Sequence, residues 1–473
     1  MKKFILFFLV LVLHLPFLVA QTKVLKKGTI LDSLPISNAN DESYALYLPT
    51  YFETTKAWPV LFAFNMEGKG KMELRIFQEA AEKQGFVLAA SNSLSDTLSL
   101  SENILIANRM FNDVFALLPI HKGRVYTGGV RSGANFAAFV PLFIKEVHGV
   151  VSWGGTISNP ELLSSKNLYF FVGLTDKQSF KYSEMLATEE LLNRLKFPNA
   201  LLVADDPGAI ARKDYIERGM VFLTLSAMSK GVTDRDEEFI RNAYEQSVNL
   251  INLAIGNIKL IEAEKLMENT IKVFRPLVDT DSLKKVQRNI KREKLYKSQK
   301  RYADNLLLKE LLTKQDLTFA LEEDIITYNY NNLGWWKFQM EELDTKYIKN
   351  AKLADQQLGH RLTGFVNALV EDNIDIQKDA KQIDEQALEF LWMLKTIIAP
   401  TDYGYYKKII SNSAKNGDYG TALFYVEELL KAGYTNRQEL YDLEHTALLR
   451  ITPEFNTLVS KYLKEARYQS IEE

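Results

Sequence analysis

The segment Val125-Tyr126-Thr127-Gly128-Gly129-Val130-Arg131-Ser132-Gly133-Ala134-Asn135 decides the fold of this chain. It has the pattern of a buried strand end, a tight turn and the start of a helix. Only one register places glycine two positions before and two positions after a central residue, with Gly129 and Gly133 around Arg131. Larger side chains at those two places would collide across a strained turn. The segment therefore predicts a sharp strand-to-helix turn with Arg131 at its tip.

Strand and helix patterns alternate on both sides of this turn, from about residue 44 to residue 229. Such alternation indicates an α/β fold, a mostly parallel sheet covered by helices, in which ligands sit at the carboxyl ends of strands. The expected strands are 44–49, 59–65, 86–92, 124–130, 149–155, 168–176 and 200–206, and the expected helices are 72–84, 102–118, 133–147, 182–195 and 211–229. We expect this domain to span 22–230.

Strand patterns disappear after about residue 233, and apolar residues then recur at helical spacing over 237–274, 306–328, 382–396 and 420–432. Asn416-Gly417-Asp418-Tyr419, followed by Ala422, resembles the turn between the helices of a tetratricopeptide-type repeat. We expect an all-α domain over 231–473, built of helical hairpins with one or two such repeat-like (TPR-like) units.

Two surface features of the helical half have competing interpretations. The run 284–301 holds nine basic residues against one acid, which favours a solvated helix face, with Val286, Ile290 and Tyr296 as its buried contacts, over a patch for an anionic partner. Trp335 and Trp336 belong to an aromatic cluster that fits a core seam between helices. Binding of a ligand or glycan by these two tryptophans is the alternative.

Composition excludes several classes of protein. The 473 residues include 58 Lys and Arg against 60 Asp and Glu, for a net charge of −2, and 47% are hydrophobic. These values fit a globular protein and argue against nucleic acid as the main partner, because phosphate binding needs a cationic surplus. Cysteine is absent, which excludes disulfides, thiolate metal sites and cysteine catalysis. We expect no metal and no cofactor.

The first twenty residues have the pattern of a secretory signal. A cationic start at Met1-Lys2-Lys3 precedes an almost wholly apolar run, and Gln21 opens a polar stretch. We expect cleavage after Ala20; an uncleaved anchor is the alternative, which the short run and its Pro16 disfavour. No later apolar run is long enough to span a bilayer. We therefore expect an exported protein, in the periplasm or at the cell surface or beyond it, whose mature chain has no transmembrane segment.

The order of these motifs resembles the α/β-hydrolase family of exported esterases and depolymerase-like proteins, in a branch with a tetratricopeptide-like helical extension. In that family the segment at the turn is usually Gly-Phe-Ser-Gly-Gly-Ala, and its serine is the nucleophile. The resemblance implies that Asp176 occupies the place of the triad acid and that a histidine should follow the last strand. The matching segments are YALYLP (44–49), PVLFAFN (59–65), AAEKQGFVL (80–88), YTGGVRSGA (126–134) and GLTD (173–176).

The departures from this pattern concern the chemistry. Arg131 stands at the nucleophile position and stays protonated, so it cannot attack a carbonyl, and Ser132 lies one residue beyond it. Near the expected histidine the chain has Asp205 and Asp206, and no histidine occurs between Asp176 and His360. An ion pair between Arg131 and Asp176 would close the former site.

We therefore expect a degenerate hydrolase that has lost serine-hydrolase catalysis and acts as a binding or scaffold protein. Its helical half would hold a protein partner. The alternative is a working esterase or acyl hydrolase that uses Ser132, with a water or an acid such as Asp206 as base.

Overall fold

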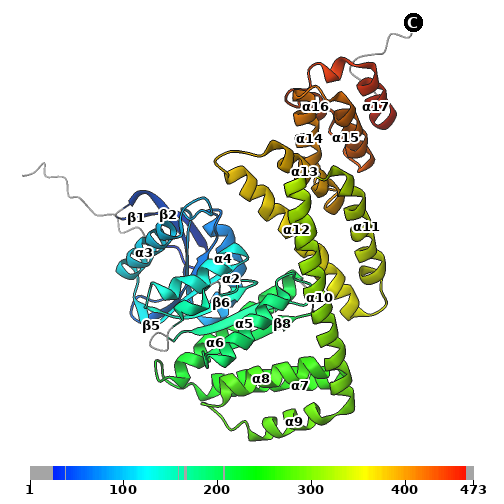
Figure 1. Ribbon diagram of the computed structural model, residues 1–473. Coiled ribbons are helices and arrows are strands. Elements are labelled where there is room, and N and C mark those ends of the chain that lie inside the picture. The colour runs from blue at the N-terminus through cyan, green and yellow to red at the C-terminus, as the bar shows by residue number, and fades with distance from the viewer. Residues whose placement is uncertain (1–24, 38, 158, 164–167, 206–207, 465–473) are drawn as a thin grey trace, which may run out of the picture.

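The computed structural model describes residues 25–37, 39–157, 159–163, 168–205 and 208–464. The expected signal 1–20, the start of the first domain and Asp206 lie outside the described residues. In the described part, a sheet flanked by helices is followed by a long helical region (Figure 1). None of the helices described there is both long enough and apolar enough to cross a membrane.

Eight strands form one sheet in the order β1-β2-β4-β3-β5-β6-β7-β8. β1 pairs with β2, and β2 with β4, in antiparallel fashion, while the remaining neighbours are parallel. The seven expected strands are confirmed, and β1 is the one that the sequence did not predict. Its Pro35 is tolerated because β1 is an edge strand. The strands are β1 (Ile30–Ile36), β2 (Ala39–Tyr47), β3 (Trp58–Phe64), β4 (Val87–Ser91), β5 (Ile120–Val130), β6 (Val147–Trp153), β7 (Phe170–Asp176) and β8 (Asn199–Ala204).

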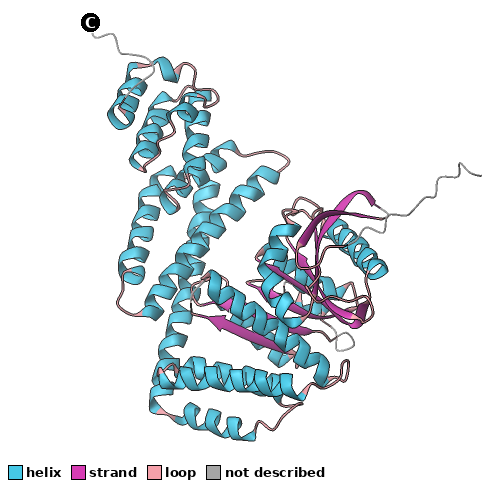
Figure 2. Cartoon of the chain, turned by 180° about the vertical axis from the view of Figure 1, so that it is seen from behind, coloured by secondary structure: helices cyan, strands magenta, loops and turns pink. Residues whose placement is uncertain are grey.

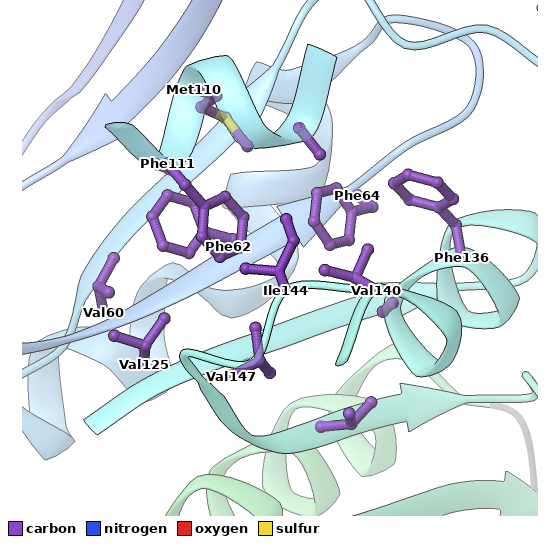
Figure 3. Packing of buried hydrophobic residues seen from close by; sticks show 14 of the residues in the cluster. Val60, Phe62, Phe64, Met110, Phe111, Val125, Phe136, Val140, Ile144 and Val147 are labelled. Atoms are coloured by element: carbon purple, nitrogen blue, oxygen red, sulfur yellow. The ribbon is translucent and has the colours of Figure 1, made fainter. Parts of the chain in front are cut away.

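Alternating side chains of the central strands divide between two cores. On one face, Phe62 stacks on Phe111 of α3, with ring centroids 3.6 Å apart, and Phe64 meets the edge of Phe136 of α4 (Figure 3). On the other face, Leu61 packs with residues of α2 and α6. The helices around the sheet are α2 (Gly70–Gln84), α3 (Leu100–Leu117), α4 (Ser132–Phe139), α5 (Tyr182–Arg194) and α6 (Ala209–Ser229).

The expected helix over 133–147 is much shorter than predicted. α4 ends at Phe139, a 3-10 turn that contains Pro141 follows, and β6 begins at Val147. Proline has no backbone N–H to donate to the preceding turn, so it cannot continue the helix. The apolar residues after α4 therefore belong to a turn and to the next strand.

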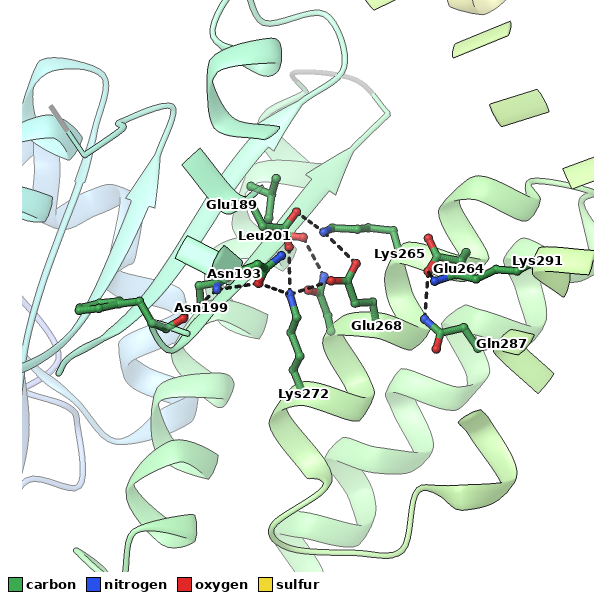
Figure 4. A network of polar contacts seen from close by, with 12 residues as sticks. Glu189, Asn193, Asn199, Leu201, Glu264, Lys265, Glu268, Lys272, Gln287 and Lys291 are labelled. Atoms are coloured by element: carbon green, nitrogen blue, oxygen red, sulfur yellow. Dashed lines mark hydrogen bonds and ion pairs between the residues drawn. The ribbon is translucent and has the colours of Figure 1, made fainter. Parts of the chain in front are cut away.

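The first two helices after residue 230 still belong to the core of the sheet. Ile240 of α7 and Phe274 of α8 lie in the same buried cluster as Leu61. Polar contacts fasten α8 to α5 and β8: the Asn269 amide donates to the Leu201 carbonyl oxygen over 2.7 Å, and Lys265 pairs with Glu189 (Figure 4). α8 thus covers the edge of the sheet, where β8 would otherwise expose unpaired backbone groups.

The rest of the chain is helical and extends away from the sheet (Figure 2). Its longest helix, α10, has 34 residues and runs beside α12. The helices after α6 are α7 (Glu237–Gly256), α8 (Leu260–Phe274), α9 (Asp281–Arg292), α10 (Lys294–Thr327), α11 (Leu333–Leu343), α12 (Leu353–Asp379), α13 (Glu385–Ile398), α14 (Tyr403–Lys415), α15 (Tyr419–Lys431), α16 (Arg437–Tyr441) and α17 (Pro453–Leu463).

Several helical expectations are confirmed, and the burial of Val286 was wrongly predicted. The Asn416 turn joins α14 to α15 in a hairpin: Gly417 has a φ of 76°, and Ala422 is fully buried. The stretch 237–274 is two helices, because the chain turns at Ile258, whose φ is 57°. In the basic run, Ile290 and Tyr296 are buried as expected, whereas Val286 is exposed.

Candidate functional site

The turn between β5 and α4 has the strained geometry that its glycines predict. Arg131 has φ 57° and ψ −123°, a region that residues with a side chain seldom adopt. A Cβ atom on Gly129 would lie 2.5 Å from the backbone of Gly133, and one on Gly133 would lie 1.9 Å from the carbonyl oxygen of Phe64. Both positions require glycine, so the chain can turn this sharply only with Arg131 at the tip.

A buried carboxylate on α2 accepts a hydrogen bond from the backbone of this turn. The Val130 N–H donates to Glu73 Oε1 over 3.0 Å, and the Glu73 residue is only 3% exposed. The Arg131 N–H donates to the Trp153 carbonyl oxygen of β6. Sequence reasoning missed Glu73, although its spacing indicates that it is buried. Glu73 precedes Phe77 by four residues and Ala81 by eight, so all three lie on the apolar face of α2.

A cleft of about 590 Å³ opens beside this turn, and we call it the elbow cleft. Arg131 and Ser132 are both exposed at its surface. His360 of α12 also lines it, so the helical region supplies part of its wall. Sequence reasoning did not place His360 there, because it lies more than 200 residues after Ser132. The lining comprises Val130, Arg131, Ser132, Asn135, Trp153, Gly154, Asp176, Gln178, Ser179, Phe180, Lys181, His360, Ala368 and Asp372.

Asp176 and Arg131 line the same cleft. Asp176 is buried at the end of β7, where its Oδ1 accepts the Gln178 N–H over 3.0 Å. Glu67 is a carboxylate that Arg131 influences: the hydrogen bond and charge of Lys69 lower the pKa of Glu67, and Arg131 adds to that effect. Asp176 caps the turn after its strand, and its ion pair with Arg131 stays a prediction.

Asp205, in the region where the family has its histidine, is held by two lysines. Lys177 Nζ lies 2.6 Å from Asp205 Oδ1, and Lys259 pairs with Oδ2. Burial disfavours the Asp205 charge, but the hydrogen bonds and charges of Lys177 and Lys259 outweigh it and hold its pKa below the usual value. Burial also opposes the charge of Lys177, yet Asp205 and Glu262 raise the pKa of Lys177. Through these contacts Asp205 joins the ends of β7 and β8 to the start of α8.

The helical region reaches this edge through a buried ion pair. Arg361 Nε donates to Glu310 Oε2 over 2.6 Å, and both residues are almost fully buried. Arg361 Nη1 also donates to the carbonyl oxygen of Lys177, directly after β7. The Gln357 amide donates to the carbonyl oxygen of Asp205. α10 and α12 are thus tied to the carboxyl ends of β7 and β8.

Trp336 cannot serve as an exposed binding residue, which corrects that alternative. Its side chain is fully buried in a core cluster, and its indole N–H donates to Asp324 Oδ2 over 2.8 Å. Trp335 is partly exposed and meets Trp336 edge to face. Trp336 therefore lies in the core seam that the sequence favoured, whereas Trp335 lies outside that buried cluster.

The described residues contain no group of three or more histidine, cysteine, aspartate or glutamate side chains placed to hold a metal ion.

Comparison with known proteins finds no matching family model and no matching curated sequence. Solved structures match the first part of the chain. A feruloyl esterase module from Clostridium thermocellum is 14% identical, with 41% of this chain and 88% of that chain covered and a TM-score of 0.34. Esterase 2 from Thermogutta terrifontis is 10% identical, with 45% of this chain and 99% of that chain covered and a TM-score of 0.34.

A third match is a dipeptidyl aminopeptidase IV-like protein from Bacteroides ovatus, 14% identical, with a TM-score of 0.31. It covers 41% of this chain but only 35% of that protein, so this chain spans about a third of its length. The eight-stranded, mostly parallel sheet with its covering helices is α/β-hydrolase-like, and a long all-helical region follows it.

Proposed function

We propose that this chain is an exported α/β-hydrolase-fold protein that has lost serine-hydrolase catalysis and acts by binding. The observation that carries the proposal is Arg131 at φ 57°, between two obligatory glycines, at the tip where the family has its serine. A guanidinium stays protonated and cannot act as a nucleophile. In serine hydrolases, removal of the nucleophile or its base costs several orders of magnitude in rate. Export rests on the signal pattern of residues 1–20.

We propose a carboxylate as the ligand of the elbow cleft. Arg131 is exposed in its lining, and an arginine fork matches the two oxygens of a carboxylate. Lys181 and His360 also line the cleft, as do Asp176 and Asp372; Lys181 pairs with Glu184 over 2.8 Å, so Arg131 is the cation that the proposal rests on. A carboxylate is also the product that an ester hydrolase releases, so the fold would retain affinity for product without the chemistry.

We propose that a protein partner docks on the helical region along α10. Five of its large apolar residues are more than half exposed. Four of them recur at intervals of four and seven, Leu308, Leu312, Phe319 and Ile326, and the fifth is Leu311. Such a row on a soluble helix is typical of a surface that another helix covers. A photo-crosslinking residue at Phe319 should capture a discrete partner in the producing cell, while one at the exposed Lys300 should not. Equal yields from both positions would contradict this surface.

The loss of catalysis is tested with a fluorophosphonate probe. Purified mature protein, its Ser132→Ala variant and an active esterase should be treated in parallel. We expect labelling of the esterase alone, since Ser132 lies outside the tip of the turn. Labelling of this protein that disappears in the Ser132→Ala variant would overturn the proposal.

One observation favours a second candidate, an esterase that uses Ser132 with His360 as its base. Both residues line the elbow cleft together with Asp176, so the helical region would replace the missing histidine. This candidate predicts probe labelling that is lost in both Ser132→Ala and His360→Gln. The binding proposal predicts that the probe labels neither the wild type nor the Ser132→Ala and His360→Gln variants.

A further inference from the structure

A second cavity, of about 430 Å³, lies where the helical region meets the carboxyl ends of β7 and β8. None of its lining residues lines the elbow cleft. The two are separated at the end of β7, where Asp176 faces the elbow cleft and Lys177 faces this cavity. On α12, likewise, His360 lines the elbow cleft and the next residue, Arg361, lines this cavity. This volume falls within the range of small-molecule sites.

The walls of the cavity are mainly apolar and come from three helices. Ile261 of α8, Leu306 and Leu307 of α10, and Leu353 and Ala354 of α12 contribute to them. Because each wall belongs to a different helix, the cavity exists only while α8, α10 and α12 are docked together. Sites that bind small molecules are commonly apolar with a few convergent polar groups, and this cavity has such a group at one end.

That polar end carries charges that cancel. Lys177 and Lys259 face Asp205 and Glu262, with Glu262 Oε2 at 3.6 Å from Lys177 Nζ and 3.7 Å from Lys259 Nζ. The remaining cation, Arg361, is paired with Glu310. A ligand that brought a net charge would disturb this balance. A neutral head group fits it.

One oxygen at the polar end lacks a hydrogen bond. Glu262 Oε2 is buried and, among the described residues, no donor lies within hydrogen-bonding distance of it. Buried polar atoms are nearly always satisfied, and a carboxylate oxygen accepts hydrogen bonds only. The two lysines stay beyond hydrogen-bonding distance of this oxygen, so a ligand group that faces it has to be a donor, such as a hydroxyl.

We infer that this cavity binds a neutral amphipathic alcohol, with its alkyl body between α8, α10 and α12 and its hydroxyl donating to Glu262. The ligand would join the helical region to the sheet and stabilise their docking. The inference is independent of the elbow cleft and of the loss of catalysis.

The experiment uses full mature protein and three probes of equal chain length: 1-octanol, octanoate and n-octylamine. Ligand-observed NMR titration should show saturable binding of 1-octanol, at least fivefold tighter than either charged probe. Glu262→Gln should weaken 1-octanol about fivefold, because a neutral acceptor replaces a charged one. Tighter binding of octanoate or octylamine, or no saturable binding of 1-octanol, would overturn the inference.

Variants that fill the cavity locate the site. Ala303→Trp on α10 and Ala354→Trp on α12 both start from partly exposed lining positions, and each should abolish 1-octanol binding while the fold is retained by circular dichroism. Leu308→Trp is the matched control on α10, since Leu308 is exposed and outside the lining. Arg131→Ala should bind 1-octanol like the wild type; a loss there would place the probe in the elbow cleft and refute the assignment.

Discussion

Replacing Arg131 with glycine should stabilise the protein, although it removes a charged side chain from the tip of the turn. The reason lies in the backbone: Arg131 has φ 57° and ψ −123°, which glycine adopts readily and other residues do not. The Arg131 N–H bond to the Trp153 carbonyl oxygen and the glycines on either side fix this conformation. The residue therefore cannot relax while the turn persists.

The magnitude follows from two opposing terms. Holding a residue with a side chain in a sparsely populated backbone region costs about 1–3 kcal/mol. Glycine gives back roughly 0.5–1 kcal/mol of this gain, because its unfolded chain has more conformational freedom to lose. The net expected gain is about 0.5–2 kcal/mol. For a domain of this size that raises the melting temperature by roughly 1–8 °C.

The assay is thermal unfolding of four proteins by differential scanning fluorimetry and circular dichroism: wild type, Arg131→Gly, Arg131→Ala and Ser132→Gly. The alanine variant removes the guanidinium but keeps the Cβ, so it should melt within about 1 °C of the wild type. Glycine at Ser132, the first residue of α4, should lower stability by roughly 0.5–1 kcal/mol. An Arg131→Gly variant that melts at or below Arg131→Ala would refute the strain argument.

The remaining predictions concern the turn and the docking of the helical region. Gly133→Ala should cost roughly 4–5 kcal/mol in chemical denaturation because its Cβ would lie 1.9 Å from a carbonyl oxygen, whereas Gly334→Ala, with open space around it, should gain roughly 0.5–1 kcal/mol. Glu310→Gln leaves the buried Arg361 without its carboxylate partner and should cost about 3–5 kcal/mol, seen as earlier unfolding and faster proteolysis of the helical region. Asp205→Asn should lower the melting temperature at pH 7. The difference should shrink as pH falls below about 4, because the pKa of Asp205 is depressed in the folded state and its contribution is lost as the pH passes through that value.

The turn at Arg131 could be predicted from the sequence because its geometry depends on local sterics. Two glycines four residues apart, a strand before them and a helix after them leave one way to arrange the backbone. The seven buried strands were predictable for a similar reason, since each is a short apolar run with turns beside it. β1 lacked that signal: its sequence ILDSLPI includes polar residues and a proline, and its pairing with β2 is irregular.

The rest of the site depended on contacts between distant residues, which no local pattern reveals. His360 reaches the elbow cleft, and Arg361 reaches the end of β7, only because α12 packs beside α10 at this edge of the sheet. Asp205 is paired with Lys259, 54 residues later. Trp336 was ambiguous for a simpler reason: an aromatic residue at helical spacing fits a core and a binding face equally well, and burial decides between them.

Arg131 and Asp205 stand where the family that this chain resembles has its nucleophile and its histidine, and both lie at the carboxyl edge of the sheet. In an active hydrolase of this fold, the segment after the last strand must leave its histidine free to reach the nucleophile. Here Lys177 and Lys259 hold Asp205 at the end of that strand, and Gln357 holds its carbonyl oxygen. The same contacts anchor α8 and α12. A serine placed at position 131 would therefore find no base among the residues after β8, because Asp205 and its backbone are already bound to Lys177, to Lys259 and to Gln357 of α12.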